Sequence, residues 1–209
     1  MKKVISVILT LILISTLAFS MQSCKSVMFS EPPELSEVRE RFIYLIEESK
    51  ELNTVLFGEG LPVYRDGEEL AERKMVYYNN NTGNYYLVNE KSPFLTVDSI
   101  KMSIERIYSK EYSADIYESA FDGIMTGAAS AYIRFYDNGS NLCQNKNASV
   151  FNITERIYDY SSMTMVEPSS GDYVNIEIDS YTVDDPTVQR LKLSFIFQNN
   201  NWYLDSPSY

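Results

Sequence analysis

Apolar residues recur with a helical period in the first part of this chain. From residue 35 to residue 56 they fall at steps of three, four and seven, while charged residues occupy the positions between them. Pro32 and Pro33 limit the start of this segment, and Gly58 limits its end. The pattern predicts one long amphipathic helix, whose apolar stripe comprises Leu35, Val38, Phe42, Leu45, Ile46, Leu52 and Leu56.

Two shorter helices are predicted further along the chain from the same spacing of apolar residues. The first covers residues 97–107, with Thr96 or Asp98 as its N-cap. The second covers residues 111–121 and follows Ser109, a residue type that favours the N-cap position.

A period of two replaces the helical period in the second half of the chain. Val174, Ile176 and Ile178 alternate with polar residues, and so do Leu191, Leu193, Phe195 and Phe197. Turn clusters separate these segments, so we expect antiparallel neighbours with one buried face. An earlier hairpin is predicted around the turn residues 79–83, because Asn and Gly tolerate positive φ. The predicted strands cover residues 73–78, 84–88, 132–137, 153–166, 173–181, 189–198 and 202–205.

Helices come first and strands last, which indicates an α+β fold, since a parallel sheet would need alternating strands and helices. One long helix, two short helices and a final run of strands resemble the NTF2-like, or cystatin-like, α+β cone of envelope lipoproteins from Gram-positive bacteria. The resemblance covers roughly residues 97–209, and the segments that carry it are Lys110-Glu111-Tyr112 and Trp202-x-Leu204-Asp205. A more distant resemblance is to secreted inhibitors of cell-wall DL-endopeptidases. The resemblance implies N-terminal helices packed on a curved antiparallel sheet, and a binding domain instead of a catalyst.

The N-terminus predicts export from the cytoplasm. Two lysines precede an uncharged apolar run over residues 4–19, as in a signal peptide. The run is shorter than the roughly 20 apolar residues that cross a bilayer, which disfavours a transmembrane anchor. Ser23 before Cys24 favours lipid attachment at Cys24, and two acyl chains would hold the protein on the outer face of the cell membrane. The alternative is secretion after cleavage near Ser20.

The chain is thus expected to have three parts: a signal peptide over residues 1–23, a tether over residues 24–34 and one domain over residues 35–209. The formal charge is −11, which argues against a nucleic-acid partner because phosphate binding depends on Lys and Arg. A lipid bilayer and a cell-envelope protein remain as expected partners. The sequence specifies no oligomeric state.

The residues for common catalytic mechanisms are missing. The chain has no histidine, which excludes Ser-His-Asp and Cys-His catalysis and histidine-bound zinc. Cys143 is expected to have only a structural role. No histidine is present to form its thiolate, and it has no disulfide partner if Cys24 carries lipid. Asp137 and the Asp184-Asp185 pair lack the spacing of a calcium loop and predict turns. We therefore expect no catalytic residue, no metal and no cofactor.

Glu177 and Asp179 form the one carboxylate pair with a spacing of interest. They lie two positions apart on a predicted strand, which puts their side chains on one face about 7 Å apart. A glycosidase uses two carboxylates about 5–10 Å apart in a cleft. A solvated strand face is the better explanation of the pair, because the two acids alternate with Val174, Ile176 and Ile178. Carboxylate-based hydrolysis is therefore the third hypothesis for this chain.

Seventeen tyrosines are present, and most lie on predicted strands, where the ring suits a half-buried surface. Tyrosine also offers a large contact area with a polar tip, which suits a protein or glycan partner. On that hypothesis the interaction face consists of Tyr173, Glu177, Asp179 and Tyr181, with the two carboxylates selecting a basic or amine-bearing partner.

The leading functional hypothesis is a non-catalytic, lipid-anchored module that binds an envelope protein, for example by occluding the cleft of a cell-wall hydrolase. The second is capture of a small ligand inside the cone. A protein-binding module should have a filled apolar interior and an exposed aromatic patch, whereas a ligand binder should have a concave pocket lined by Tyr and Met.

Overall fold

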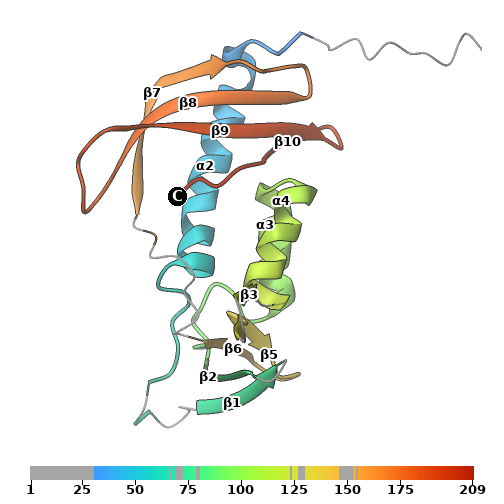
Figure 1. Cartoon of the computed structure of the whole chain (residues 1–209), viewed down its shortest axis with the longest axis vertical. Coiled ribbons are helices and arrows are strands. Elements are labelled where there is room, and N and C mark those ends of the chain that lie inside the picture. The colour runs from blue at the N-terminus through green and yellow to red at the C-terminus, as the bar shows by residue number, and fades with distance from the viewer. Residues whose placement is uncertain are drawn as a thin grey trace, which may run out of the picture. The chain divides into compact units, whose positions relative to one another are not determined.

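The computed structural model describes residues 31–65, 67–68, 73–78, 81–122, 124–126, 130–145, 153 and 155–209. Pro32–Tyr209 forms one compact unit (Figure 1). The predicted signal peptide and Cys24 lie outside the described residues. No helix within the described ranges is both long enough and apolar enough to cross a bilayer.

The longest helix, α2, covers Leu35–Phe57 and confirms the predicted amphipathic helix. Phe42, Leu45 and Ile46 of its stripe are fully buried, whereas Leu35 at the start of the helix is half-buried. The helix ends at Gly58, whose N–H donates to the carbonyls of Asn53 and Thr54. The buried stripe packs against β7 and β10 of the larger sheet and against α3.

The two predicted short helices are also present. Helix α3 covers Val97–Ile107, and Thr96 is its N-cap, with the reciprocal hydrogen bonds of a capping box to Ser99. Helix α4 covers Lys110–Tyr117, one residue earlier than predicted, because the Ser109 hydroxyl accepts the N–H of Tyr112. The last predicted turn is a π-helix, η2, at Glu118–Asp122.

The C-terminal strands form the predicted antiparallel meander, with the order β10-β9-β8-β7. The tight turn between the last two strands places Asn199 and Asn200 at positive φ, 51° and 61°. The predicted start of β7 was three residues too early, and the other boundaries agree within one residue. The strands are β7 (Arg156–Val166), β8 (Tyr173–Thr182), β9 (Gln189–Gln198) and β10 (Asn201–Leu204).

The buried face of the meander contains Val174, Ile176 and Ile178 of β8, as the alternation predicted. Phe195 of β9 stacks on Phe42 of α2 with ring centroids 3.9 Å apart. The alternation was wrong at Phe197, which is 40% exposed because it lies near the end of β9, against Trp202. The core therefore lies between α2 and this sheet.

A second sheet has the order β1-β2-β6-β5, and a separate hairpin pairs β3 with β4. The predicted hairpin is confirmed, but its turn is shorter than expected. Residues 81–83 pair with residues 76–78 in the ladder, so they belong to β2 and not to the turn. The elements are β1 (Arg73–Tyr78), β2 (Asn81–Leu87), β3 (Ile124–Thr126), β4 (Ser130–Tyr132), β5 (Phe135–Asp137) and β6 (Leu142–Asn145).

The prediction of a single strand over residues 132–137 was wrong, because the chain breaks at Arg134. The Arg134 N–H donates to the carbonyl of Ala120, and its buried guanidinium donates to the carbonyl of Gly58 at 2.6 Å. This places a cation at the C-terminal end of α2, where the helix dipole favours positive charge. Burial lowers the pKa of Arg134 to about 10, so the group stays protonated at neutral pH. With helices packed on antiparallel sheets, the fold is α+β, as predicted.

Candidate functional site

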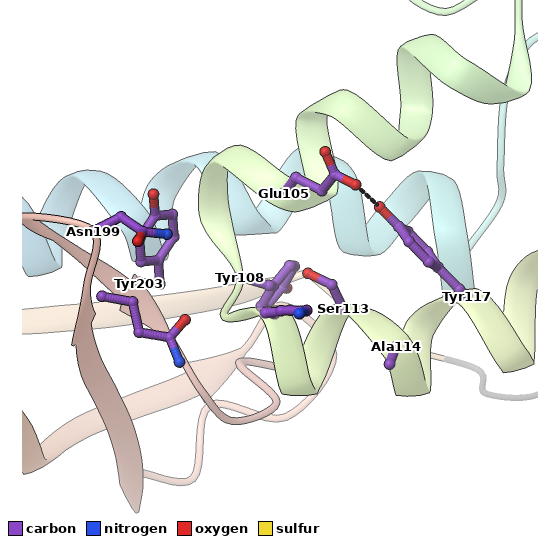
Figure 2. Close-up of a pocket in the computed structure, with 9 residues that line it drawn as sticks. Glu105, Tyr108, Ser113, Ala114, Tyr117, Asn199 and Tyr203 are labelled. Carbon is purple, nitrogen blue, oxygen red and sulfur yellow. Dashed lines mark hydrogen bonds between the residues drawn. The ribbon is translucent and has the colours of Figure 1, made fainter.

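A pocket of about 450 Å³ lies between the helical pair α3–α4 and the turn that joins β9 to β10 (Figure 2). Its volume falls within the range of about 300–1,000 Å³ that small-molecule sites occupy. The lining combines tyrosine rings with hydroxyl, amide and charged groups. The lining residues are Glu105, Tyr108, Lys110, Ser113, Ala114, Tyr117, Gln198, Asn199 and Tyr203.

Main-chain contacts hold the two walls of the pocket together. Tyr108 and Leu204 form a parallel β-bridge between the α3–α4 junction and β10. The Ser109 N–H donates to the carbonyl of Leu204 at 2.9 Å, and the Ser109 hydroxyl donates to the carboxylate of Asp205. On the opposite side, the positive φ of Asn199 turns the chain so that β10 returns beside β9.

Three tyrosines form the aromatic part of the lining. Tyr108 is buried, and its hydroxyl donates to Asn53 Oδ1 at 2.7 Å, so only its ring contributes to the pocket surface. Burial raises the pKa of Tyr108 well above the ordinary phenol value. Tyr117 and Tyr203 are half-buried, and the Tyr117 hydroxyl donates to the Glu105 carboxylate at 2.7 Å (Figure 2). Burial, together with that hydrogen bond, also raises the pKa of Tyr117.

Ser113 differs from the other residues that line the pocket. Its side chain is 3% exposed, and within the described structure its Oγ has no hydrogen-bond partner. Figure 2 shows the hydroxyl pointing toward Tyr108, between the Glu105–Tyr117 pair and the Asn199–Tyr203 pair. Buried hydroxyls nearly always have a partner, and leaving one without costs about 1–3 kcal/mol. A polar atom of a bound molecule would supply the missing partner.

Two opposite charges also face this pocket. Glu105 and Lys110 are both exposed, and neither forms a salt bridge with another residue of the described ranges. Lys101, one helical turn before Glu105, lies over the rings of Tyr117 and Phe121 at 5.0 and 5.1 Å from their centroids. Next to Lys110, the carboxylate of Glu111 accepts a hydrogen bond from Gln198 at 2.8 Å.

The interaction face predicted from the sequence lies elsewhere, on the outer face of β8. Tyr173, Glu177, Asp179 and Tyr181 occupy alternate positions of that strand and none of them lines the α3–α4 pocket. The Tyr173 hydroxyl donates to Ser194 Oγ at 3.1 Å. The structure therefore places the four residues on one surface, as the spacing predicted.

Arg190 of β9 changes the chemistry of that surface. Its guanidinium donates to Asp179 at 2.9 Å and to Glu177 at 3.2 Å, and these hydrogen bonds raise the pKa of Arg190. It also donates to Thr164 Oγ1 at 2.6 Å and to the carbonyl of Ser162. Both carboxylates thus share one cation, which opposes their use as the acid and nucleophile of a hydrolase. Arg190 was not predicted as a site residue, although its register opposite Asp179 follows from the meander.

The remaining sequence candidates have local structural roles. Cys143 is buried beside Tyr85 and Ile133. Asp137 and Asp185 each accept the backbone N–H two residues further on, at 2.9 and 3.0 Å, as expected of turns. Within the described residues, no cluster of three or more Cys, Asp or Glu side chains could hold a metal ion.

Sequence reasoning missed Glu105, Lys110 and Ser113. One signal was present: Ser113 lies three residues before Ile116 and seven before Ala120, on the apolar face of α4 and η2. A hydroxyl on a buried helical stripe is a candidate for binding. No protein-family model matches the chain, and no curated protein matches it with significant similarity.

Proposed function

We propose that this chain is a lipid-anchored, extracytoplasmic binding protein without catalytic activity, which holds a small polar molecule in the α3–α4 pocket. The observation that carries the proposal is the buried Ser113 hydroxyl, which lacks a partner in the described structure and lies at the lining of a 450 Å³ pocket. Three tyrosines around it match the aromatic lining expected of a ligand binder, although no methionine takes part. The pocket lies beside the sheet end and not inside a cone.

The proposed location of the protein is based on its N-terminal sequence. Residues 1–23 are proposed to direct export, and Cys24 to carry the acyl chains that hold the protein at the outer face of the membrane. Cleavage near Ser20, with secretion, is the alternative. An NTF2-like relationship remains a proposal, supported by the packing of α2 on an antiparallel meander.

The proposal can be tested with the processed protein, purified in detergent from the membrane of an expressing bacterium. The protein would be equilibrated with a small-molecule extract, and bound molecules would be identified by native mass spectrometry. We expect Ser113→Met to abolish binding, because the longer side chain would enter the pocket. Ser140→Met, at an exposed turn, is the matched control and should bind as wild type does. Equal binding by Ser113→Met and wild type would contradict the proposal, as would no bound molecule at all.

A second candidate function is the protein-binding module, and one observation favours it. Val183 and Val188, in the loop between β8 and β9, are 59% and 63% exposed. Ile157, also exposed, pairs with Tyr181 across the β7–β8 ladder, so the aliphatic residues continue the predicted interaction face. Large exposed apolar groups that cluster are typical of protein contacts.

This candidate would be tested by adding the purified protein to a cell-wall hydrolase of the same envelope. Inhibition by wild type, lost when Tyr173, Glu177 and Tyr181 are changed to Ala, would support it. A matched control carries Ala at Glu51, Glu90 and Lys91, three exposed residues outside this face. If wild type neither binds nor inhibits any hydrolase of that envelope, the interaction face has no such role.

A further inference from the structure

We infer that the ligand of the α3–α4 pocket is a zwitterion that carries both an ammonium and a carboxylate group, such as a free amino acid or a short peptide. The inference rests on the proposed function, because it names the ligand class of the same pocket.

Glu105 supplies the site for the ammonium group. The Tyr117 hydroxyl orients its carboxylate through a 2.7 Å hydrogen bond, and a carboxylate can accept further hydrogen bonds from a ligand. Lys101 lies one helical turn before Glu105, but its ammonium lies over the Tyr117 and Phe121 rings and forms no salt bridge with Glu105. The rings of Tyr108 and Tyr203 line the same pocket and can attract a cation through their faces.

Lys110 supplies the site for the carboxylate group. It is the first residue of α4, where the helix dipole adds to its positive charge. The neighbouring acid, Glu111, accepts a hydrogen bond from Gln198 at 2.8 Å. Ser113, one turn further along α4, offers its buried hydroxyl to the same ligand.

The two opposite charges in the pocket disfavour a ligand that carries only one charge. A plain anion would face the negative carboxylate of Glu105, and a plain cation would face the ammonium of Lys110. Glu105 and Lys110 line one pocket but do not form a salt bridge, so they do not neutralise each other directly. A ligand with both charges can satisfy both groups, while the amides of Gln198 and Asn199 remain for its neutral part.

The test measures binding of a panel of free amino acids and dipeptides to the processed protein by titration calorimetry. The best zwitterion would then be compared with its N-acetyl derivative, which lacks the ammonium, and its amide, which lacks the carboxylate. We expect each derivative to bind at least about tenfold more weakly. Glu105→Gln should weaken binding of the zwitterion by a similar factor but leave binding of the N-acetyl derivative unchanged. Lys110→Gln should likewise weaken binding of the zwitterion but leave binding of the amide unchanged. Glu51→Gln and Lys192→Gln, at exposed positions outside the pocket, are the matched controls.

Three outcomes are distinguishable. Loss of affinity that follows this pairing of variant and derivative supports the inference. Binding of a neutral molecule such as a hexose, unaffected by Glu105→Gln and Lys110→Gln but lost in Ser113→Met, overturns the inference and leaves the proposed function standing. Binding of neither the panel nor any molecule of the small-molecule extract overturns both.

Discussion

Two buried serine hydroxyls, at Ser49 and Ser113, have opposite surroundings. Ser49 is 0% exposed, donates to the carbonyl of Ile46 and shares a 2.7 Å hydrogen bond with Ser208. Ser113 is nearly as buried, yet the described structure gives its Oγ no partner. A buried hydroxyl can therefore have one of two roles in this molecule. Where the fold supplies partners the group stabilises the structure, and where it does not the group is available to a ligand.

Tyr108 connects the two regions. Its hydroxyl donates to Asn53 Oδ1, and Asn53 Nδ2 donates to Ser208 at 2.9 Å. The Tyr158 hydroxyl donates to the carbonyl of Ser208. We refer to Ser49, Asn53, Tyr108, Tyr158 and Ser208 as the Asn53 network. Because the ring of Tyr108 lines the pocket, this network also fixes part of the pocket surface.

The largest effect is expected from Asn53→Ala. It removes two hydrogen bonds, one of them accepted from the buried Tyr108 hydroxyl, which should lower the free energy of unfolding by about 3 kcal/mol. Urea denaturation would measure the change. Thr54→Ala, at the next and exposed position of α2, is the control and should cost no more than about 0.5 kcal/mol. Equal stability of the two variants would show that the network is not needed for the fold.

Ser208→Ala should have the next largest effect. The variant removes the acceptor of Asn53 Nδ2 and the partner of Ser49, while Ser49 keeps its hydrogen bond to Ile46, so we expect a loss of about 1–2 kcal/mol. Combined with Asn53→Ala in a double-mutant cycle, it should show a coupling energy of at least about 0.5 kcal/mol. Additive effects would mean that the two residues act independently.

Ser113→Ala should have the opposite effect, with little change in stability and a loss of ligand binding. Removing a buried hydroxyl that lacks a partner should leave the free energy of unfolding within about 0.5 kcal/mol of wild type, or raise it. The same change should weaken ligand binding about tenfold, because one hydrogen bond to the ligand is lost. Thermal unfolding with and without ligand measures both. A stability loss as large as that of Ser208→Ala would contradict the assignment.

The smallest effect is expected at the solvent edge of the Asn53 network, where Tyr160 stacks near Tyr158. Burial alone would raise the pKa of Glu47, but hydrogen bonds from Tyr160 and Lys50 lower it below 4.5. A carboxyl with a lowered pKa in the folded state stabilises the fold at neutral pH, and this contribution is lost as the pH falls below 4.5. The stability difference between wild type and Glu47→Gln should therefore stay constant at pH values well above 4.5 and shrink as the pH falls below it, as measured by urea denaturation. A difference that does not shrink there would exclude this linkage.

The sequence predicted the elements whose pattern extends over several turns or residues. Helix α2 and the strands β8 and β9 have periodic apolar residues, and the structure confirms them. Strand β6 was missed because all four of its residues are buried, so no alternation marks it. The break at Arg134 was missed because its cause is a contact with Gly58, far away in the sequence.

The candidate pocket could not be predicted from the sequence, for a similar reason. Its walls come from α3 and α4 on one side and from the β9–β10 turn on the other, and no local pattern shows that these segments meet. The outer face of β8 was predictable because residues two apart on a strand share a face. The pairing of its carboxylates with Arg190 needed the register between β8 and β9.

The bridge between Tyr108 and Leu204 bears on how this site could change its specificity. The backbone bond from Ser109 to Leu204 joins the pocket walls without using the side chain of either residue. Ala114 lines the pocket but is exposed and holds no part of the core, whereas the positive φ of Asn199 makes the β9–β10 turn depend on that residue. Redesign of ligand preference can thus begin at Ala114, with the scaffold left intact.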